Sequence, residues 1–211
     1  MALKFNDTKG AAIKSGVDTY KYEDGDQSFR IVGDVLARYV YWLKGENNKD
    51  IPFECLAFNR DTEAFDNAEK DWVRYEYPNL KCGWAYAVQA IDPKDGKLKV
   101  VNLKKKLWAQ IMTAAEDLGD PTDTETGWDV VFRKKKTGPL PINVEYELLT
   151  LKLKKRPLND TERAAIAELK SMDQVMPRPT PDQQKELLNK IRNGTVAESI
   201  DEEIESEFKI D

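Results

Sequence analysis

The chain has 211 residues, of which 40% are hydrophobic and 34% are charged, and its formal net charge is −5. Its length allows one ordinary domain with appendages, and no apolar run approaches the ~20 residues of a membrane-spanning helix. Because the sequence has no histidine and only two cysteines, Cys55 and Cys82, it excludes a Cys/His zinc site and any nucleophile paired with histidine. Any catalysis would have to rely on carboxylates, lysines and tyrosines. We expect a protein without metal or cofactor that is not an enzyme.

The first half of the chain predicts strands. Residues 1–17 are expected to be a flexible arm, and their lack of an apolar signal region favours a cytoplasmic location, the host cytoplasm if the protein is viral. Strands rich in β-branched and aromatic residues are predicted at 19–23, at 28–43 with a break only at Gly33-Asp34, and at 51–58. Residues 59–80 predict a long connection with a helical turn at 62–70, and long loops of this kind often carry function.

The second half predicts two hairpins around a helix. Residues 81–92 and 97–103 flank a Pro-Lys-Asp-Gly turn, and 128–136 and 142–155 flank a second turn. Between them, apolar residues with helical spacing predict an amphipathic helix that ends at Gly119. Two further helices are expected at 160–172 and 181–192.

This order predicts a mainly β protein. A strand, a hairpin, a helix and a second hairpin follow one another as in an OB-like five-stranded barrel with one inserted helix. We accordingly divide the chain into the arm at 1–17, an OB-like domain at 18–157, a helical appendage at 158–196 and a disordered acidic tail at 197–211.

The charge is distributed unequally along the chain. After Val196 come seven carboxylates and one cation, so this segment carries −6 and the rest of the chain +1. Such a terminal block is typical of an interaction tail, although it can also serve only to keep the protein soluble. The residues expected to bind a partner are Asp201, Glu202, Glu203, Ile204, Glu205 and Phe208.

Cations and aromatics supply the candidate binding site. Lysines and arginines crowd at both hairpins, where they repel one another unless an anion such as a phosphate lies among them; a solvated hairpin tip is the alternative. Aromatic side chains beside cations stack on the bases of single strands, although each is individually more often part of a core. The predicted DNA-binding residues are Tyr39, Tyr41, Trp42, Lys44, Phe58, Arg60, Trp72, Arg74, Tyr75, Tyr77, Lys81, Trp84, Tyr86, Lys105, Lys106, Arg133, Lys134, Lys135 and Lys136.

The segment 81–111 also resembles a known family. Its Trp84-Ala85, Asp92-Pro93, Gly96-Lys97 and Lys105-Lys106-Leu107-Trp108 are similar to the corresponding motifs of the helix-destabilising single-stranded DNA-binding proteins of tailed phages. The segments SFRIVGD and GWDVVFRKKK and the acidic terminus extend the resemblance. This chain lacks the zinc subdomain of that family's best-known members, and its arm does not clearly reproduce their basic cooperativity motif.

The resemblance implies a protein that coats and protects single-stranded DNA in phage replication, recombination and repair. It further implies that the tail recruits replication and recombination proteins, that no membrane is bound, and that the protein is a monomer or self-associates weakly on DNA. Two alternatives are a carboxylate-metal nuclease, for which the acid-x-Lys spacing is absent, and a protein-interaction adaptor without affinity for nucleic acid.

Overall fold

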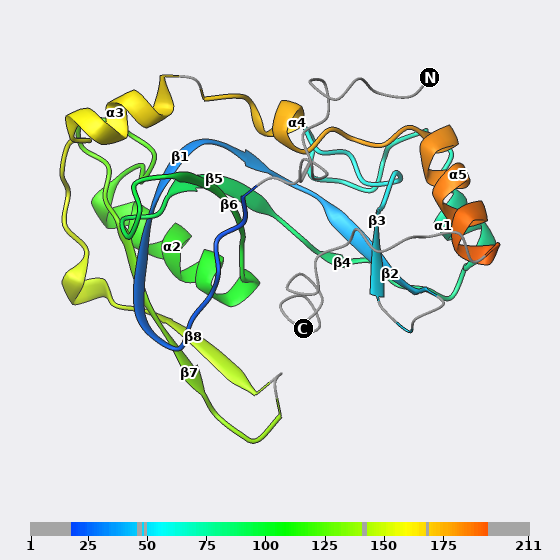
Figure 1. Cartoon of the computed structure of the whole chain (residues 1–211), viewed down its shortest axis with the longest axis horizontal. Coiled ribbons are helices and arrows are strands. Elements are labelled where there is room, and N and C mark those ends of the chain that lie inside the picture. The colour runs from blue at the N-terminus through cyan, green and yellow to red at the C-terminus, as the bar shows by residue number, and fades with distance from the viewer. Residues whose placement is uncertain (1–17, 46–47, 49, 141–142, 168, 194–211) are drawn as a thin grey trace, which may run out of the picture.

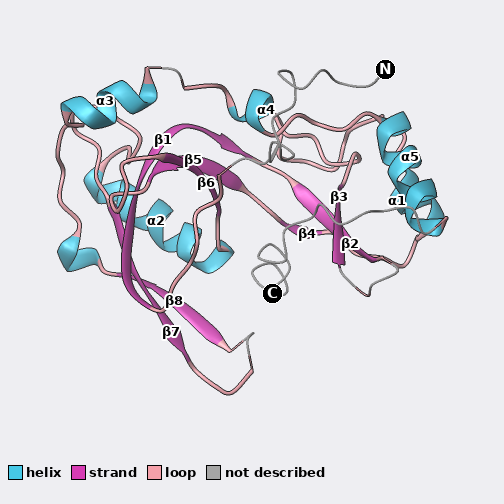
Figure 2. Ribbon diagram, in the orientation of Figure 1, coloured by secondary structure: helices cyan, strands magenta, loops and turns pink. Residues whose placement is uncertain are grey.

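The computed structural model describes residues 18–45, 48, 50–140, 143–167 and 169–193. The protein is mainly β, with a five-stranded antiparallel sheet in the order β6-β5-β1-β7-β8 and a three-stranded antiparallel sheet in the order β3-β2-β4 (Figures 1 and 2). The strands are β1 (Gly25–Leu36), β2 (Tyr39–Lys44), β3 (Asp50–Glu54), β4 (Gly83–Trp84), β5 (Ala87–Ile91), β6 (Leu98–Asn102), β7 (Val130–Lys136) and β8 (Val144–Leu148).

Strand β1 is the centre of the larger sheet. Its first half pairs with β7, its second half pairs with β5, and the register shifts between Val32 and Val35. Gly33, with a φ of +71°, lies in this bulge, and a Cβ there would come within 2.9 Å of the Leu169 side chain. A glycine is needed because both the backbone conformation and the close approach exclude a side chain.

Five α-helices accompany the sheets. They are α1 (Trp72–Glu76), α2 (Lys105–Leu118), α3 (Asp160–Ile166), α4 (Met172–Val175) and α5 (Pro181–Arg192), and a short 3-10 helix spans Thr150–Lys152. Helix α2 buries Leu107 and Ile111 beside β8 and ends at Gly119, as its periodicity predicts. Within the described residues, no helix is long and apolar enough to cross a membrane.

One apolar core runs through both sheets. Phe29 and Phe132 of the larger sheet, Phe53 of the smaller sheet and Leu188 of α5 all belong to the same buried cluster. Helix α5 packs on α1 at the side of the smaller sheet, which lies at the right of Figure 1. The two sheets are therefore stabilised by the same burial of apolar surface.

Residues 169–180, called the strap below, connect α3 to α5. Met172 is buried against Leu36, Ala87 and Val100, which lie on strands β1, β5 and β6. The Gln89 side chain donates to the backbone carbonyl of Lys170 at 2.6 Å. The strap thus covers part of one face of the larger sheet before it reaches the smaller one.

Several predicted boundaries are wrong. The strand expected at 28–43 is two strands in different sheets, because the chain leaves the larger sheet at Ala37-Arg38. There the backbone N–H of Ala85 donates to the carbonyl of Arg38, and the Arg38 side chain donates to the carbonyl of Ala85. The strand expected at 19–23 makes one parallel bridge, between Thr19 and Val100.

Other expected elements are shorter or displaced. The strand expected at 51–58 ends at Glu54, because Asp71 accepts the next backbone N–H groups of Leu56 and Ala57. The helical turn expected at 62–70 is a series of turns, and the helix α1 follows it. The helix expected at 160–172 is divided between α3 and α4.

The barrel itself is not reproduced as expected. In the described residues β6 and β8 lie at opposite ends of the larger sheet, so a closed barrel is not confirmed. Helix α2 precedes the last hairpin, as expected, but the chain between β1 and β5 also carries the three-stranded sheet.

Candidate nucleic-acid interface

The β7–β8 hairpin separates its charged residues onto two faces. Lys134 pairs with Tyr146 on one face, while Arg133 and Lys135 lie opposite Glu147 and Glu145 on the other. The alternation follows from the two-residue period of a strand. The four predicted cations at 133–136 are all on this hairpin, but they do not form one continuous patch.

Carboxylates of the same chain lie among these cations. Asp24 contacts Lys134 and Lys136 at 3.7 and 3.5 Å, and Asp26 pairs with Arg133 and, at 2.7 Å, with Lys152. Hydrogen bonds from Arg133 and Lys152 hold the pKa of the Asp26 carboxyl far below its usual range. The crowded cations of the sequence indicated that an anion lies among them. In the structure, carboxylates of the same chain supply part of that negative charge.

A second set of contacts joins the hairpin to the start of α2. Lys104 lies over the rings of Tyr22 and Tyr146, at 5.1 and 5.8 Å from their centroids. The two rings meet edge to face at 5.3 Å. Sequence reasoning missed Tyr22, Lys104 and Tyr146; the signal was that Lys104 directly precedes a helix and Tyr146 lies across from Lys134.

Four of the predicted DNA-binding lysines form no ion pair within the described residues. Lys105 and Lys106 begin α2, where the N-cap makes no side-chain hydrogen bond and the first turn contains no acidic residue. Backbone N–H groups at a helix start attract anions, and the two lysines add to this field. The four residues are Lys81, Lys105, Lys106 and Lys135.

Helix α1 presents the most exposed predicted aromatic residue. Tyr75 is 66% exposed and meets the ring of Trp72 edge to face at 5.8 Å. Lys70 lies 3.6 Å from the centroid of Tyr75, and Lys185 of α5 lies 4.2 Å from that of Trp72. These four residues, called the α1 site below, combine cations with accessible rings, as single-strand-binding surfaces do.

A third aromatic group lies on the smaller sheet. Trp84 and Tyr86 stack at 4.4 Å, and Tyr39 contacts Phe65 at 5.0 Å. Phe65 is 53% exposed; it lies in the aromatic-bearing connection expected at 59–80 but was not among the predicted DNA-binding residues. The hydroxyl of Tyr86 donates to Glu63 at 2.7 Å, so this group faces a carboxylate as well as solvent.

Three predicted aromatic residues are buried. Tyr41, Phe58 and Tyr86 are 3%, 1% and 7% exposed, and stacking on a base would require the core around them to open. Trp42, Trp72, Tyr77 and Trp84 are half-buried, and Arg74 and Lys81 are exposed. Lys44 is exposed and pairs with Asp50 at 2.6 Å.

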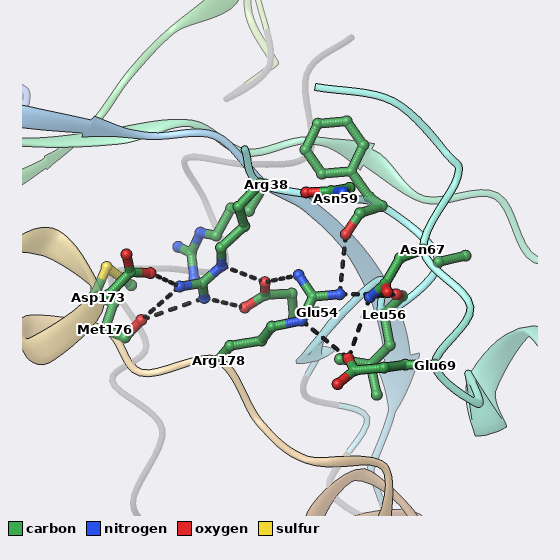
Figure 3. A network of polar contacts seen from close by, with 12 residues as sticks. Arg38, Glu54, Leu56, Asn59, Asn67, Glu69, Asp173, Met176 and Arg178 are labelled. Carbon is green, nitrogen blue, oxygen red and sulfur yellow. Dashed lines mark hydrogen bonds and ion pairs between the residues drawn. The ribbon is translucent and has the colours of Figure 1, made fainter. Parts of the chain in front are cut away.

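A network of polar contacts around Glu54 fastens the strap to the smaller sheet (Figure 3). Arg60 belongs to this network. Its guanidinium pairs with Glu54 at 2.7 Å and with Asp173, and it also donates to the carbonyl of Met176 at 3.2 Å. Arg178 donates to the carbonyls of Leu56 and Phe58 at 2.7 and 2.9 Å. The Arg60 side chain is only 9% exposed, and its guanidinium donates to Glu54, Asp173 and Met176 of the same chain.

Arg38 lies beside this network, as Figure 3 shows. Burial lowers the pKa of Arg38 to about 10, in spite of the nearby charge of Glu54. Its Nε donates to the carbonyl of Ala85 at 2.9 Å, which places a guanidinium at the junction of the two sheets.

The two cysteines, distant in sequence, share a hydrogen bond. This bond from Cys55 lowers the pKa of the Cys82 thiol to about 7, and it raises that of buried Cys55. The Tyr41 hydroxyl donates to the sulfur of Cys55 at 3.2 Å. In the described residues no group of three or more Cys, Asp or Glu is arranged to hold a metal ion.

The predicted partner-binding residues of the tail, Asp201 to Phe208, lie outside the described residues.

The combination of an antiparallel β fold, lysines around a helix start and accessible aromatic rings is characteristic of proteins that bind single-stranded nucleic acid. No family model matches the chain. The chain is similar to a protein of Escherichia phage T5 named "Probable ssDNA-binding protein", with 28% identity over 232 aligned residues that cover 92% of this chain and 88% of that protein. The predicted similarity to phage single-stranded DNA-binding proteins is thereby confirmed.

Proposed function

We propose that this protein binds single-stranded DNA without catalysing a reaction. The observation that carries the proposal is the similarity, over nearly the whole chain, to a phage protein named as a probable single-stranded DNA-binding protein. In the same proposal, the protein coats and protects DNA during phage replication, recombination and repair in the host cytoplasm.

The larger sheet supports an OB-like interpretation. With β1, β5, β6, β7 and β8 as the five strands, α2 stands between the third and the fourth, as expected from the sequence. In OB folds, oligonucleotides contact the face of strands 2 and 3 and the loops after strands 1 and 4. The segment between β1 and β5, which contains α1, would be the first of these loops. The connection between β7 and β8 would be the second.

This interpretation assigns roles to the accessible residues. Phosphates would contact Lys105, Lys106 and Lys135, which have no carboxylate partner in the described residues. Bases would stack at the α1 site, where Tyr75 is the most exposed ring among the predicted contacts. The buried residues Tyr41, Phe58 and Arg60 would contribute to the site only through the fold.

The acidic tail would have two roles in the proposal. A tethered peptide reaches a nearby cationic surface at an effective concentration on the order of millimolar, so it would compete with DNA at low salt. It would also bind replication and recombination proteins through Ile204 and Phe208.

A titration with oligo-dT at several salt concentrations tests the proposal. Trp72 and Trp84 are half-exposed, so we expect intrinsic fluorescence to decrease on binding. The logarithm of the affinity should fall linearly with the logarithm of salt, by about 0.7 for each phosphate that is neutralised. Absence of binding at low salt would reject the function and favour an adaptor.

A further inference from the structure

The turn before β1 brings three carboxylates to the cations around the β7–β8 hairpin. Residues 23–26, called the acidic turn below, contain Glu23, Asp24 and Asp26. Glu23 pairs with Lys94, and the two aspartates pair with cations of the hairpin and of the 3-10 helix. The five paired cations are Lys94, Arg133, Lys134, Lys136 and Lys152.

The backbone places these carboxylates. Gly25 and Asp26 already belong to β1 and pair with Lys134 and Arg133 of β7. Gly25 has a φ of +95°, which lets the chain turn into the strand. The Gln27 side chain accepts from the backbone N–H of Glu23 at 3.0 Å. The acidic turn therefore stays beside the hairpin even when its ion pairs are broken.

The ion pairs themselves contribute little to the stability of the fold. The side chains of Asp24 and Lys136 are 53% and 69% exposed, and those of Asp26 and Lys152 are 37% and 55% exposed. Solvent-exposed pairs of this kind contribute little to stability and are weakened by salt. They can consequently be exchanged for another anion at low cost.

We propose that the acidic turn occupies phosphate-binding positions of the hairpin, and that the phosphates of a single strand replace it. Asp24 and Asp26 mark where the phosphates bind: one beside Lys134 and Lys136, the other beside Arg133 and Lys152. On binding, the cations exchange a carboxylate for a phosphate, and the carboxylates turn to solvent. The acidic turn thus lowers the affinity at low salt; this inference rests on the proposed function.

The test compares the full-length protein with its Asp24→Asn/Asp26→Asn variant. We expect the variant to bind oligo-dT ~3- to 20-fold more tightly at low salt, because the exposed ion pairs of both carboxylates no longer have to be broken. The gain should shrink as salt rises, so the salt dependence of the variant should be steeper than that of the wild type. Equal or weaker binding by the folded variant would overturn the inference.

Two controls make the result specific. Glu116→Gln/Asp117→Asn on α2 changes the net charge equally, at carboxylates that form no ion pair within the described residues, and should raise affinity much less. Lys136→Gln should weaken binding more in an Asp24→Asn background than in the wild type, because only there is Lys136 free of Asp24.

The failures can be distinguished. If neither the wild type nor the variant binds oligo-dT, the proposed function fails. If the wild type binds and the variant gains nothing over the α2 control, only this inference fails. If the double variant is destabilised, the single variant Asp24→Asn serves as the test instead. Asp24 contacts Lys136 and Lys134 at 3.5 and 3.7 Å, which is too long for hydrogen bonds.

Discussion

Removal of the Tyr75 ring separates stacking on DNA from stabilisation of the fold. Tyr75 is 66% exposed, and its contacts are the edge of Trp72 at 5.8 Å and the ammonium of Lys70 at 3.6 Å. An exposed cation–π contact contributes about 0.5–1 kcal/mol, so Tyr75→Ala should lower the free energy of unfolding by no more than about that amount. A stacked base, in contrast, contributes roughly 1–3 kcal/mol, which is a ~5- to 150-fold loss of affinity.

Fluorescence anisotropy with labelled oligo-dT measures the affinity, and thermal unfolding followed by circular dichroism measures the stability. Tyr75→Phe keeps the ring and should bind nearly as the wild type does. Leu151→Ala removes a side chain that is 98% exposed on the 3-10 helix and serves as the matched control. If Tyr75→Ala binds within twofold of the wild type, the α1 site does not stack on DNA and the reasoning is refuted.

Three further predictions concern the tail, the network around Glu54 and the thiols. Deletion of residues 197–211 should raise DNA affinity at low salt, with a smaller gain at high salt, in the same anisotropy assay; unchanged affinity would leave the tail only a docking or solubility role. Glu54→Gln should lower the free energy of unfolding by about 3–5 kcal/mol and Tm by ~6–20 °C, because Arg60 would lose its buried carboxylate partner and keep only the exposed Asp173, and a shift below about 3 °C would contradict this. Alkylation of Cys82 by iodoacetamide should rise with pH around a midpoint of about 7, since its lowered pKa populates the thiolate above that pH, whereas a midpoint near 9 would show that Cys55 does not affect it.

The sequence determined the elements whose signals are local. The β5–β6 and β7–β8 hairpins and helix α2 with its stop at Gly119 follow from turn residues and from periodicity, which neighbouring residues specify by themselves. The same reasoning indicated the crowding of cations at the hairpins and the similarity to phage DNA-binding proteins.

Only the tertiary structure decided how these elements and side chains are used. Both faces of the segment 35–43 are apolar, so no local pattern could show that the chain changes sheets at Arg38. Tyr75, Tyr41 and Phe58 have the same kind of sequence context, but in the structure Tyr75 is exposed whereas Tyr41 and Phe58 belong to the core. The partners of Arg60 and Arg133 come from residues up to 116 positions away, and charges so distant in sequence meet only when strands pair and the strap closes over the sheet.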